Sequence, residues 1–374
     1  MAESVDALVS NTSGATRAGS TPALGTRLLK WECCKFFLQH FFKTYKRTMT
    51  MNKLCIMILA AMTMMVACNG QKQNVKGGLE EPVGPAFSAD SAYAFCQQQC
   101  DFGPRTMNSE AHEQCGQWIV SKFQSLGMEV IEQRATLKAF DGTLLQSNNI
   151  IAQFRPQCSD RLMICAHWDS RPWADNDPDE ANHTKPVMAA NDGASGVGVM
   201  LELARLLSSA DSTLRQDLGV DFICFDAEDW GNDDFADSWA LGAQYWAAHP
   251  HRNGYKPRYG ILLDMVGGQG ATFYQEGFSR KHASMVVDRV WQAAEVVGYG
   301  SLFPKQDGNY ITDDHGPVND VAGIPCIDII PYYPHCQQST FGPTWHTVDD
   351  TMEHLDRNTL KAVGQTLVQV IFSE

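Results

Sequence analysis

The 374-residue chain is poor in basic residues and has no long apolar segment. Its 29 Lys and Arg residues stand against 43 Asp and Glu residues, which gives a net charge of −14 at pH 7. A groove for nucleic acid needs clustered cations, so the composition argues against a nucleic-acid partner. No run of 18 or more apolar residues occurs, and the sequence therefore predicts no ordinary transmembrane helix.

The motifs of several common protein classes are missing as well. The HExxH pattern of zincin peptidases fails at His112, since Gly116 stands where the second His is required. No GxSxG occurs, which argues against a serine hydrolase of the nucleophile-elbow type. The 12 cysteines follow the spacing of neither a small disulfide scaffold nor a zinc finger.

Residues 51–68 have the features of a signal for export. Lys53 precedes a 13-residue apolar stretch, 54–66, which has the length of a signal peptide and is too short to span a bilayer. The stretch ends in small residues before Cys68, which resembles a bacterial lipobox and predicts lipidation of that cysteine. An ordinary signal peptide, with Cys68 incidental, is the alternative. In both cases we expect an exported protein, and with the lipobox a periplasmic, membrane-anchored lipoprotein.

The position of this signal divides the chain into four parts. Residues 1–50 precede the signal, and we expect them to be an upstream extension that the natural protein lacks. Residues 69–86 are polar and rich in Gly, Gln and Lys, so they are expected to form a flexible tether. Residues 87–374 are then expected to form the folded domain.

Apolar strand patterns and helical patterns alternate through the folded part. Short buried strands are predicted at 161–166, 218–225 and 322–330, and helices at 110–126 and 359–372. This alternation predicts a single α/β domain with a mostly parallel, twisted sheet that helices cover on both faces.

Acids and a histidine follow the predicted strands. His167 comes directly after the strand 161–166, Glu228 and Asp229 come after the strand 218–225, and Asp264 ends a further apolar run. Ligands of open α/β sheets bind at the carboxyl ends of the strands, so these side chains are candidates for one site. Of two adjacent acids, one can hold a metal while the other stays free as a base. A solvated acidic loop is the simpler alternative for Glu228 and Asp229.

Further candidates come from the predicted helix starts and the late loops. Asp192 precedes a helical pattern, where a negative charge is stabilised, and it has a plain capping role as its alternative. Asp313 and His346 lie in loops near the C-terminus. A site of His, Asp and Glu without Cys suits zinc with an open coordination position, which is typical of a catalytic zinc.

Five short motifs carry a resemblance to a known family. In chain order they are HWDS (167–170), NDGASG (191–196), FDAED (225–229), LLDMVG (262–267) and WHTVDD (345–350). This set resembles the M28 zinc peptidases over roughly residues 95–374. Two further segments, FGPTWHT (341–347) and ITDDH (311–315), resemble the animal-type and bacterial zinc-dependent glutaminyl cyclases. Those enzymes convert an N-terminal glutamine to pyroglutamate and release ammonia, so peptides or proteins with N-terminal Gln are the expected substrates.

The resemblance implies roles for individual residues. It assigns a single zinc to Asp192, Asp229 and His346, and Asp229 departs from the family's usual Glu at its position. It places Glu228 as the general base, with Asp264 and Asp313 beside the reacting groups. The implied glutamine pocket is formed by Phe341, Trp345 and Ile311, with Trp230 and Trp239 as further candidates for its wall.

A two-zinc aminopeptidase is the main alternative. It would use His167, Asp192, Asp229, Asp264 and His346 as metal ligands, with Glu228 activating a water molecule. His167, Asp169 and His315 are accordingly candidates for a second metal or for support of the first. Trp345, Phe341 and the Asp-Asp-His segment favour the cyclase. A binding lipoprotein without activity would need a broken ligand set, and this set is intact.

Overall fold

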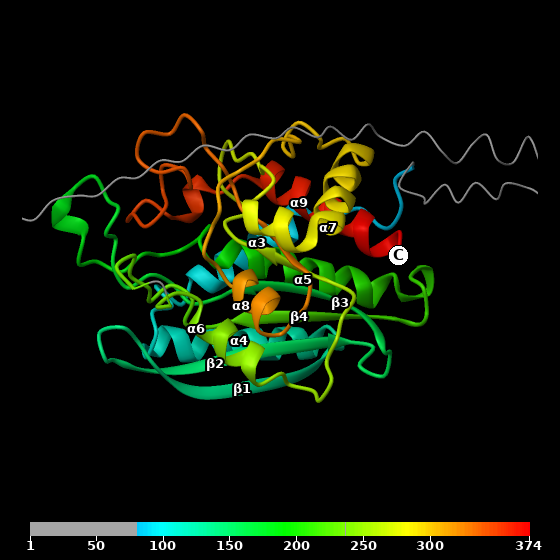
Figure 1. The fold of residues 1–374 in the computed structure, drawn as a ribbon, viewed down its shortest axis with the longest axis horizontal. Helices are drawn as coiled ribbons and strands as arrows, with labels where there is room; N and C mark the ends of the chain where they lie inside the picture. The colour runs from blue at the N-terminus through cyan, green and yellow to red at the C-terminus, as the bar shows by residue number, and fades with distance from the viewer. Residues whose placement is uncertain (1–80, 236) are drawn as a thin grey trace, which may run out of the picture. The chain divides into compact units, whose positions relative to one another are not determined.

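A twisted six-stranded sheet forms the centre of the computed structural model, which describes residues 81–235 and 237–374 (Figure 1). Its strands are β1 (Glu129–Lys138), β2 (Leu144–Phe154), β3 (Asp160–His167), β4 (Leu218–Phe225), β5 (Gly260–Leu263) and β6 (Cys326–Ile329). They lie in the order β1-β2-β4-β3-β5-β6. The last four strands of that order run parallel, whereas β2 is antiparallel to β1 and to β4. The prediction of a mostly parallel sheet is therefore confirmed.

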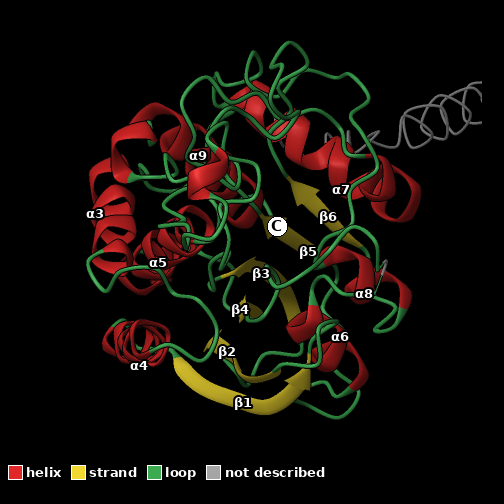
Figure 2. Cartoon of the chain, turned by 90° about the vertical axis from the view of Figure 1, so that its left-hand side faces the viewer, coloured by secondary structure: helices red, strands yellow, loops and turns green. Residues whose placement is uncertain are grey.

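Helices cover both faces of the sheet, as predicted (Figure 2). Helices α4 and α5 contact one face, α6 and α8 contact the other, and α7 packs against β6 and α9. The described α-helices are α3 (Ala89–Cys100), α4 (Glu110–Ser125), α5 (Ala194–Ser209), α6 (Leu241–Ala248), α7 (Gly277–Val296), α8 (His315–Asp320) and α9 (Arg357–Phe372), and the 3₁₀ helices are η1 (Glu180–Asn182), η2 (Asp211–Thr213) and η3 (Met352–His354). No helix in the described ranges is long and apolar enough to cross a membrane.

Strand β4 shows how the sequence pattern creates the two cores. Every residue of this strand is buried, and successive side chains point to opposite faces of the sheet. Phe222 and Cys224 belong to the larger core, under α4 and α5, whereas Ile223 and Phe225 belong to the smaller core with Trp246 of α6. A strand buried on both faces is apolar almost throughout, with Asp221 as the one charged residue here, which is why the run 218–225 predicted its bounds so well.

The N-terminal end of the described chain lies along α9. The Gln369 side chain accepts a hydrogen bond from the Val83 backbone N–H at 2.7 Å and donates one to the Glu81 carbonyl at 3.1 Å. The last residues of the predicted tether are therefore hydrogen-bonded to this helix. The predicted extension, signal peptide and lipidated Cys68, together with the rest of the tether, lie outside the described residues.

Candidate active site

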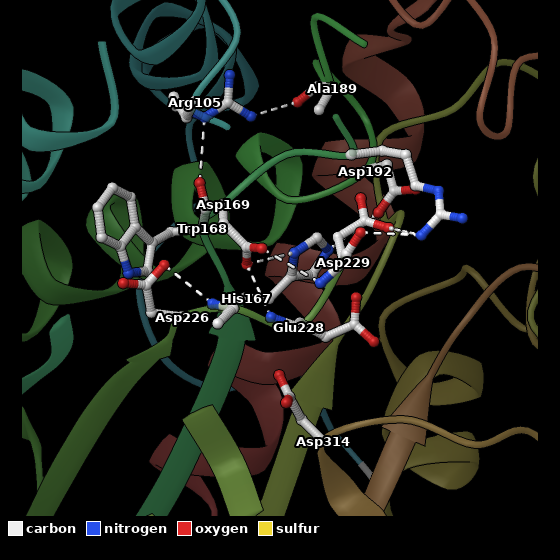
Figure 3. Close-up of polar contacts among 12 residues, drawn as sticks. Arg105, His167, Trp168, Asp169, Ala189, Asp192, Asp226, Glu228, Asp229 and Asp314 are labelled. Carbon is white, nitrogen blue, oxygen red and sulfur yellow. Dashed lines mark hydrogen bonds and ion pairs between the residues drawn. The ribbon is translucent and has the colours of Figure 1, made fainter. Parts of the chain in front are cut away.

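Three parallel strands bring the predicted acids and histidine to one edge of the sheet (Figure 3). Strand β3 ends at His167, β5 ends just before Asp264, and Glu228 follows β4 by three residues. Asp192 reaches the same place from the loop that leads into α5, and His346 reaches it from the loop before η3. The sheet topology thus gathers residues that are separated by up to 179 positions in the chain.

Asp192, Asp229 and His346 form a group that fits a zinc ion. One ligand atom from each lies within 4.8 Å of the others, and all three residues are buried. His346 Nε2 is 3.1 Å from Asp229 Oδ1 and 3.6 Å from Asp192 Oδ2. Neither Asp229 oxygen has a hydrogen-bond partner in the described part of the chain. Buried carboxylate oxygens without partners are costly, so this donor set is suited to a cation, and its composition matches catalytic zinc.

A second group shares Asp192 with the first. His167 Nε2 lies 2.9 Å from Asp192 Oδ1 and 3.2 Å from Asp264 Oδ1. One atom from each of these three residues also falls within 4.8 Å of the others. Asp192 presents one oxygen to each group, which is the arrangement that a two-metal site requires.

The turn after β4 is held in a strained conformation. Ala227 has φ of +53°, in the left-handed region that costs a residue with a side chain about 1–3 kcal/mol. Before it, the Asp226 carboxylate contacts His112 Nε2 at 2.9 Å and accepts a hydrogen bond from the Asn148 N–H at 2.6 Å. These buried contacts compensate for the strain. The turn therefore directs Glu228 and the following Asp229 toward the site.

Two carboxylates hold the backbone of the site residues. Asp169 accepts hydrogen bonds from the N–H groups of Glu228 at 3.1 Å and Asp229 at 3.2 Å (Figure 3). Asp350 accepts one from the Asp192 N–H at 3.0 Å and another from the preceding residue at 2.8 Å. Sequence reasoning proposed Asp169 but missed Asp350, although it lies within the WHTVDD motif.

Arg171 and Asp175 orient the late-loop histidine, and sequence reasoning missed both. The Arg171 guanidinium donates to the backbone carbonyl of Asp229 at 2.9 Å and to the Asp175 carboxylate at 2.6 Å. Asp175 Oδ1 in turn lies 3.5 Å from His346 Nδ1. A carboxylate beside the second ring nitrogen is usual for a metal-binding histidine, because it orients the ring.

Burial raises the pKa of several carboxyls around the cavity. It raises the pKa of Asp264 to about 6 and that of Asp313 to about 7, with neighbouring carboxylates adding to the effect. The pKa of Glu228 rises well above its ordinary value, mainly through burial, although the nearby His167 opposes the change. A raised pKa at a buried acid in a cavity is typical of a functional site.

A third buried group of acids and histidine includes Asp313. One atom each of Asp313, His315 and Asp328 falls within 4.8 Å of the others, and His315 Nε2 is 3.2 Å from Glu276 Oε2. Burial acts to raise the pKa of Glu276, but the contact with His315 and the hydrogen bonds from Ser279 lower it to about 2. Glu276 and Asp328 were missed from the sequence. An acid inside the apolar run of β6 was the available signal for Asp328.

A cavity of about 360 Å³ opens onto the site. Glu228, Asp264 and Asp313 line it together with the three residues of the first group and with the aromatic and aliphatic side chains Phe341, Trp345, Ile311 and Trp239. The Trp345 ring stacks on His346, with centroids 3.9 Å apart. Trp230 does not line this cavity, since its ring packs edge-on against Trp173 with centroids 5.1 Å apart.

Comparisons with known proteins find related sequences. The model of "Peptidase family M28" matches residues 149–371. Aminopeptidase YwaD of Bacillus subtilis is 29% identical over 64% of this chain and 48% of its own length. The glutaminyl-peptide cyclotransferase of Gloydius blomhoffii is 28% identical over 59% of this chain and 63% of its own length. The match thus spans less than two thirds of each of these curated relatives.

A solved structure covers the described fold more fully. The glutaminyl cyclase of Bacteroides thetaiotaomicron, bound to N-acetylhistamine, is 48% identical to this chain. The similarity covers 78% of this chain and 100% of that one, with a TM-score of 0.75. The fold predicted from the sequence, and its resemblance to the cyclases, are both confirmed by this likeness.

Proposed function

Since the chain belongs to peptidase family M28 and is an enzyme of the M28 and glutaminyl cyclase type, we propose that it is a zinc-dependent glutaminyl-peptide cyclotransferase. Its substrates would be peptides and proteins with an N-terminal glutamine. The observation that carries the proposal is a cavity with aromatic walls, including Phe341 and Trp345, that opens directly onto the zinc-compatible group. Such a cavity suits a single bound side chain whose amide faces that group.

The chain's own residues account for binding and proton movement. A zinc ion held by Asp192, Asp229 and His346 would supply Lewis-acid polarisation of the glutamine γ-carbonyl. The substrate's α-amine attacks its own γ-carbonyl carbon, so both reacting groups arrive on one molecule and little additional entropy is lost. A C–N bond to the α-nitrogen forms, and the bond to the amide nitrogen breaks.

Glu228 is the residue placed to move the proton. Its carboxylate lines the cavity, while Asp169 holds its backbone from the other side (Figure 3). Glu228 accepts the proton that the α-amine loses and delivers it to the departing nitrogen, which leaves as ammonia. Asp264 and Asp313 also line the cavity and are positioned to accept hydrogen bonds from the amine.

The proposal is tested by following two products with zinc counted per chain. We expect ammonia release from a Gln-initiated peptide, no free residue from a Leu-initiated peptide, and about one zinc. Glu228→Gln should abolish ammonia release while zinc stays bound, because the change removes the base and leaves the three metal-binding residues intact. Wild-type turnover in Glu228→Gln would show that Glu228 is not the group that transfers the proton.

An aminopeptidase is the second candidate, and the group of His167, Asp192 and Asp264 favours it. This group lies beside the first, and one ligand atom from each of its residues also lies within 4.8 Å of the others. Release of free leucine from the Leu-initiated peptide, with two zinc ions per chain, would identify the protein as an aminopeptidase and not a cyclase.

We further propose that the protein is exported to the periplasm and anchored by a lipid on Cys68. The support is the signal-like sequence of residues 51–68. Mass spectrometry of the natural protein should find a lipidated N-terminal Cys68. A peptide from residues 1–50 would contradict both the anchor and the interpretation of those residues as an upstream extension.

A further inference from the structure

A second cavity adjoins the active-site cavity. It measures about 400 Å³ and lies among residues of α6, α7 and α8. Trp239, Ile311, Thr312 and Asp313 line both cavities, so the two share one wall. The second cavity is therefore adjacent to the place where the residues after a bound N-terminal residue would lie.

The second cavity combines negative charge with apolar surface. Its carboxylates are Asp237, Asp313 and Asp320, and its apolar lining includes Phe278 and Pro317. Among the described residues that line the two cavities, none is Lys or Arg. An apolar surface beside carboxylates suits a long basic side chain, whose methylene stem packs while its charged end meets an acid.

Asp313 marks the junction of the two cavities. It is only 4% exposed, and its Oδ2 atom has no hydrogen-bond partner in the described chain. Farther out, Asp320 is 71% exposed, with His282 Nε2 3.8 Å from its Oδ1. Lys281 does not line the second cavity, although its Nζ lies 5.6 Å from the ring centroid of Phe278, which does. The acids therefore range from a buried position at the wall to a solvent-exposed one at the rim.

We propose that the second cavity binds the residues that follow the N-terminal glutamine and selects peptides with Lys or Arg at the second position. This inference rests on the proposed cyclase activity. An exposed ion pair changes an equilibrium by up to about fivefold, and the factors of two pairs multiply. Asp237 and Asp320 together therefore give at most about 25-fold, and we expect a preference of roughly tenfold. Salt screens such pairs, and the preference therefore falls as ionic strength rises.

The test compares Gln-Lys-Gly-Phe, Gln-norleucine-Gly-Phe and Gln-Glu-Gly-Phe amides. Norleucine keeps the lysine stem without its charge, so it isolates the electrostatic part. We expect kcat/KM for ammonia release to fall in the order Lys, norleucine, Glu at low salt. In Asp237→Asn/Asp320→Asn the ratio of Lys to Glu peptide should fall by about tenfold, because two carboxylates are lost.

A charge-matched control separates the cavity from the overall charge of the protein. Asp90→Asn/Asp217→Asn removes two carboxylates of similar exposure, 88% and 77%, at the start of α3 and at the amino end of β4. We expect it to keep the wild-type ratio. An equal shift in this control, or equal kcat/KM for all three peptides in the wild type, would overturn the inference while the cyclase activity stands. Absence of ammonia from every peptide would overturn the proposed function and the inference together.

Discussion

Asp169 should control metal affinity without being a ligand in the single-zinc site. Its two carboxylate oxygens accept the N–H groups of Glu228 and Asp229 at 3.1 and 3.2 Å, and its Oδ1 lies 3.5 Å from His167 Nδ1. In Asp169→Asn, an amide NH₂ replaces one oxygen and faces a backbone N–H, so one buried donor loses its acceptor. The cost of such a loss is about 1–3 kcal/mol.

We expect this cost to destabilise the zinc-bound state of the protein. Ala227 stays in its left-handed conformation only while its neighbours hold it, and Asp169 anchors both residues that follow it. If the turn relaxes in the zinc-free protein, 1–3 kcal/mol corresponds to about a 5- to 150-fold weaker zinc affinity. Changes to residues that support metal ligands commonly cost 10- to 100-fold in affinity or activity, which is the same range.

The assay is competition for zinc against a chelator of known affinity, with ammonia release measured at saturating zinc. Asp141→Asn is the matched control, because this acid lies in the exposed turn between β1 and β2. Circular dichroism should show the wild-type fold in both variants. A zinc affinity of Asp169→Asn within twofold of the wild type would refute the positioning argument.

Three other predictions concern stability. Gly196→Ala should lower the free energy of unfolding by about 1–3 kcal/mol, since its Cβ would lie 2.4 Å from the Leu263 carbonyl oxygen; Gly316→Ala meets nothing within 4 Å, and urea denaturation should find it within about 0.5 kcal/mol of the wild type. The low pKa of Glu276 stabilises the fold above pH 4.5 by up to about 3 kcal/mol, and this contribution is lost as the pH falls from 4.5 toward about 2. Glu276→Gln should therefore be less stable than the wild type at pH 7 in zinc-free urea titrations, and a gap that stays constant down to pH 3 would contradict the assignment. Zinc at 100 times its Kd should stabilise the wild type by about 2.7 kcal/mol, and calorimetry should find this gain abolished in Asp229→Ala.

The sequence by itself determined the elements and the inventory of the site. Strand β4 was readable because a strand buried on both faces is apolar at nearly every position, and Asp221 is the one charged residue between Leu218 and Phe225. The side chains after the parallel strands, such as His167 and Asp264, were readable because the carboxyl ends of those strands share one edge. Helix α4 was readable from its helical pattern over 110–126, and in the structure the Ser109 side chain caps it by accepting a hydrogen bond from the N–H of His112.

Only the tertiary structure decided which groups touch. Asp350 accepts a hydrogen bond from the backbone N–H of Asp192, although the two residues are 158 positions apart in the chain. Glu276, directly before α7, contacts His315, the first residue of α8. Trp230 follows Asp229 directly, yet it packs outside the cavity that Asp229 lines. The physical reason is that the sequence pattern of one segment predicts only the burial and hydrogen bonding within that segment. The direction of a side chain in a loop, and the partner it meets, depend instead on how distant segments pack against it.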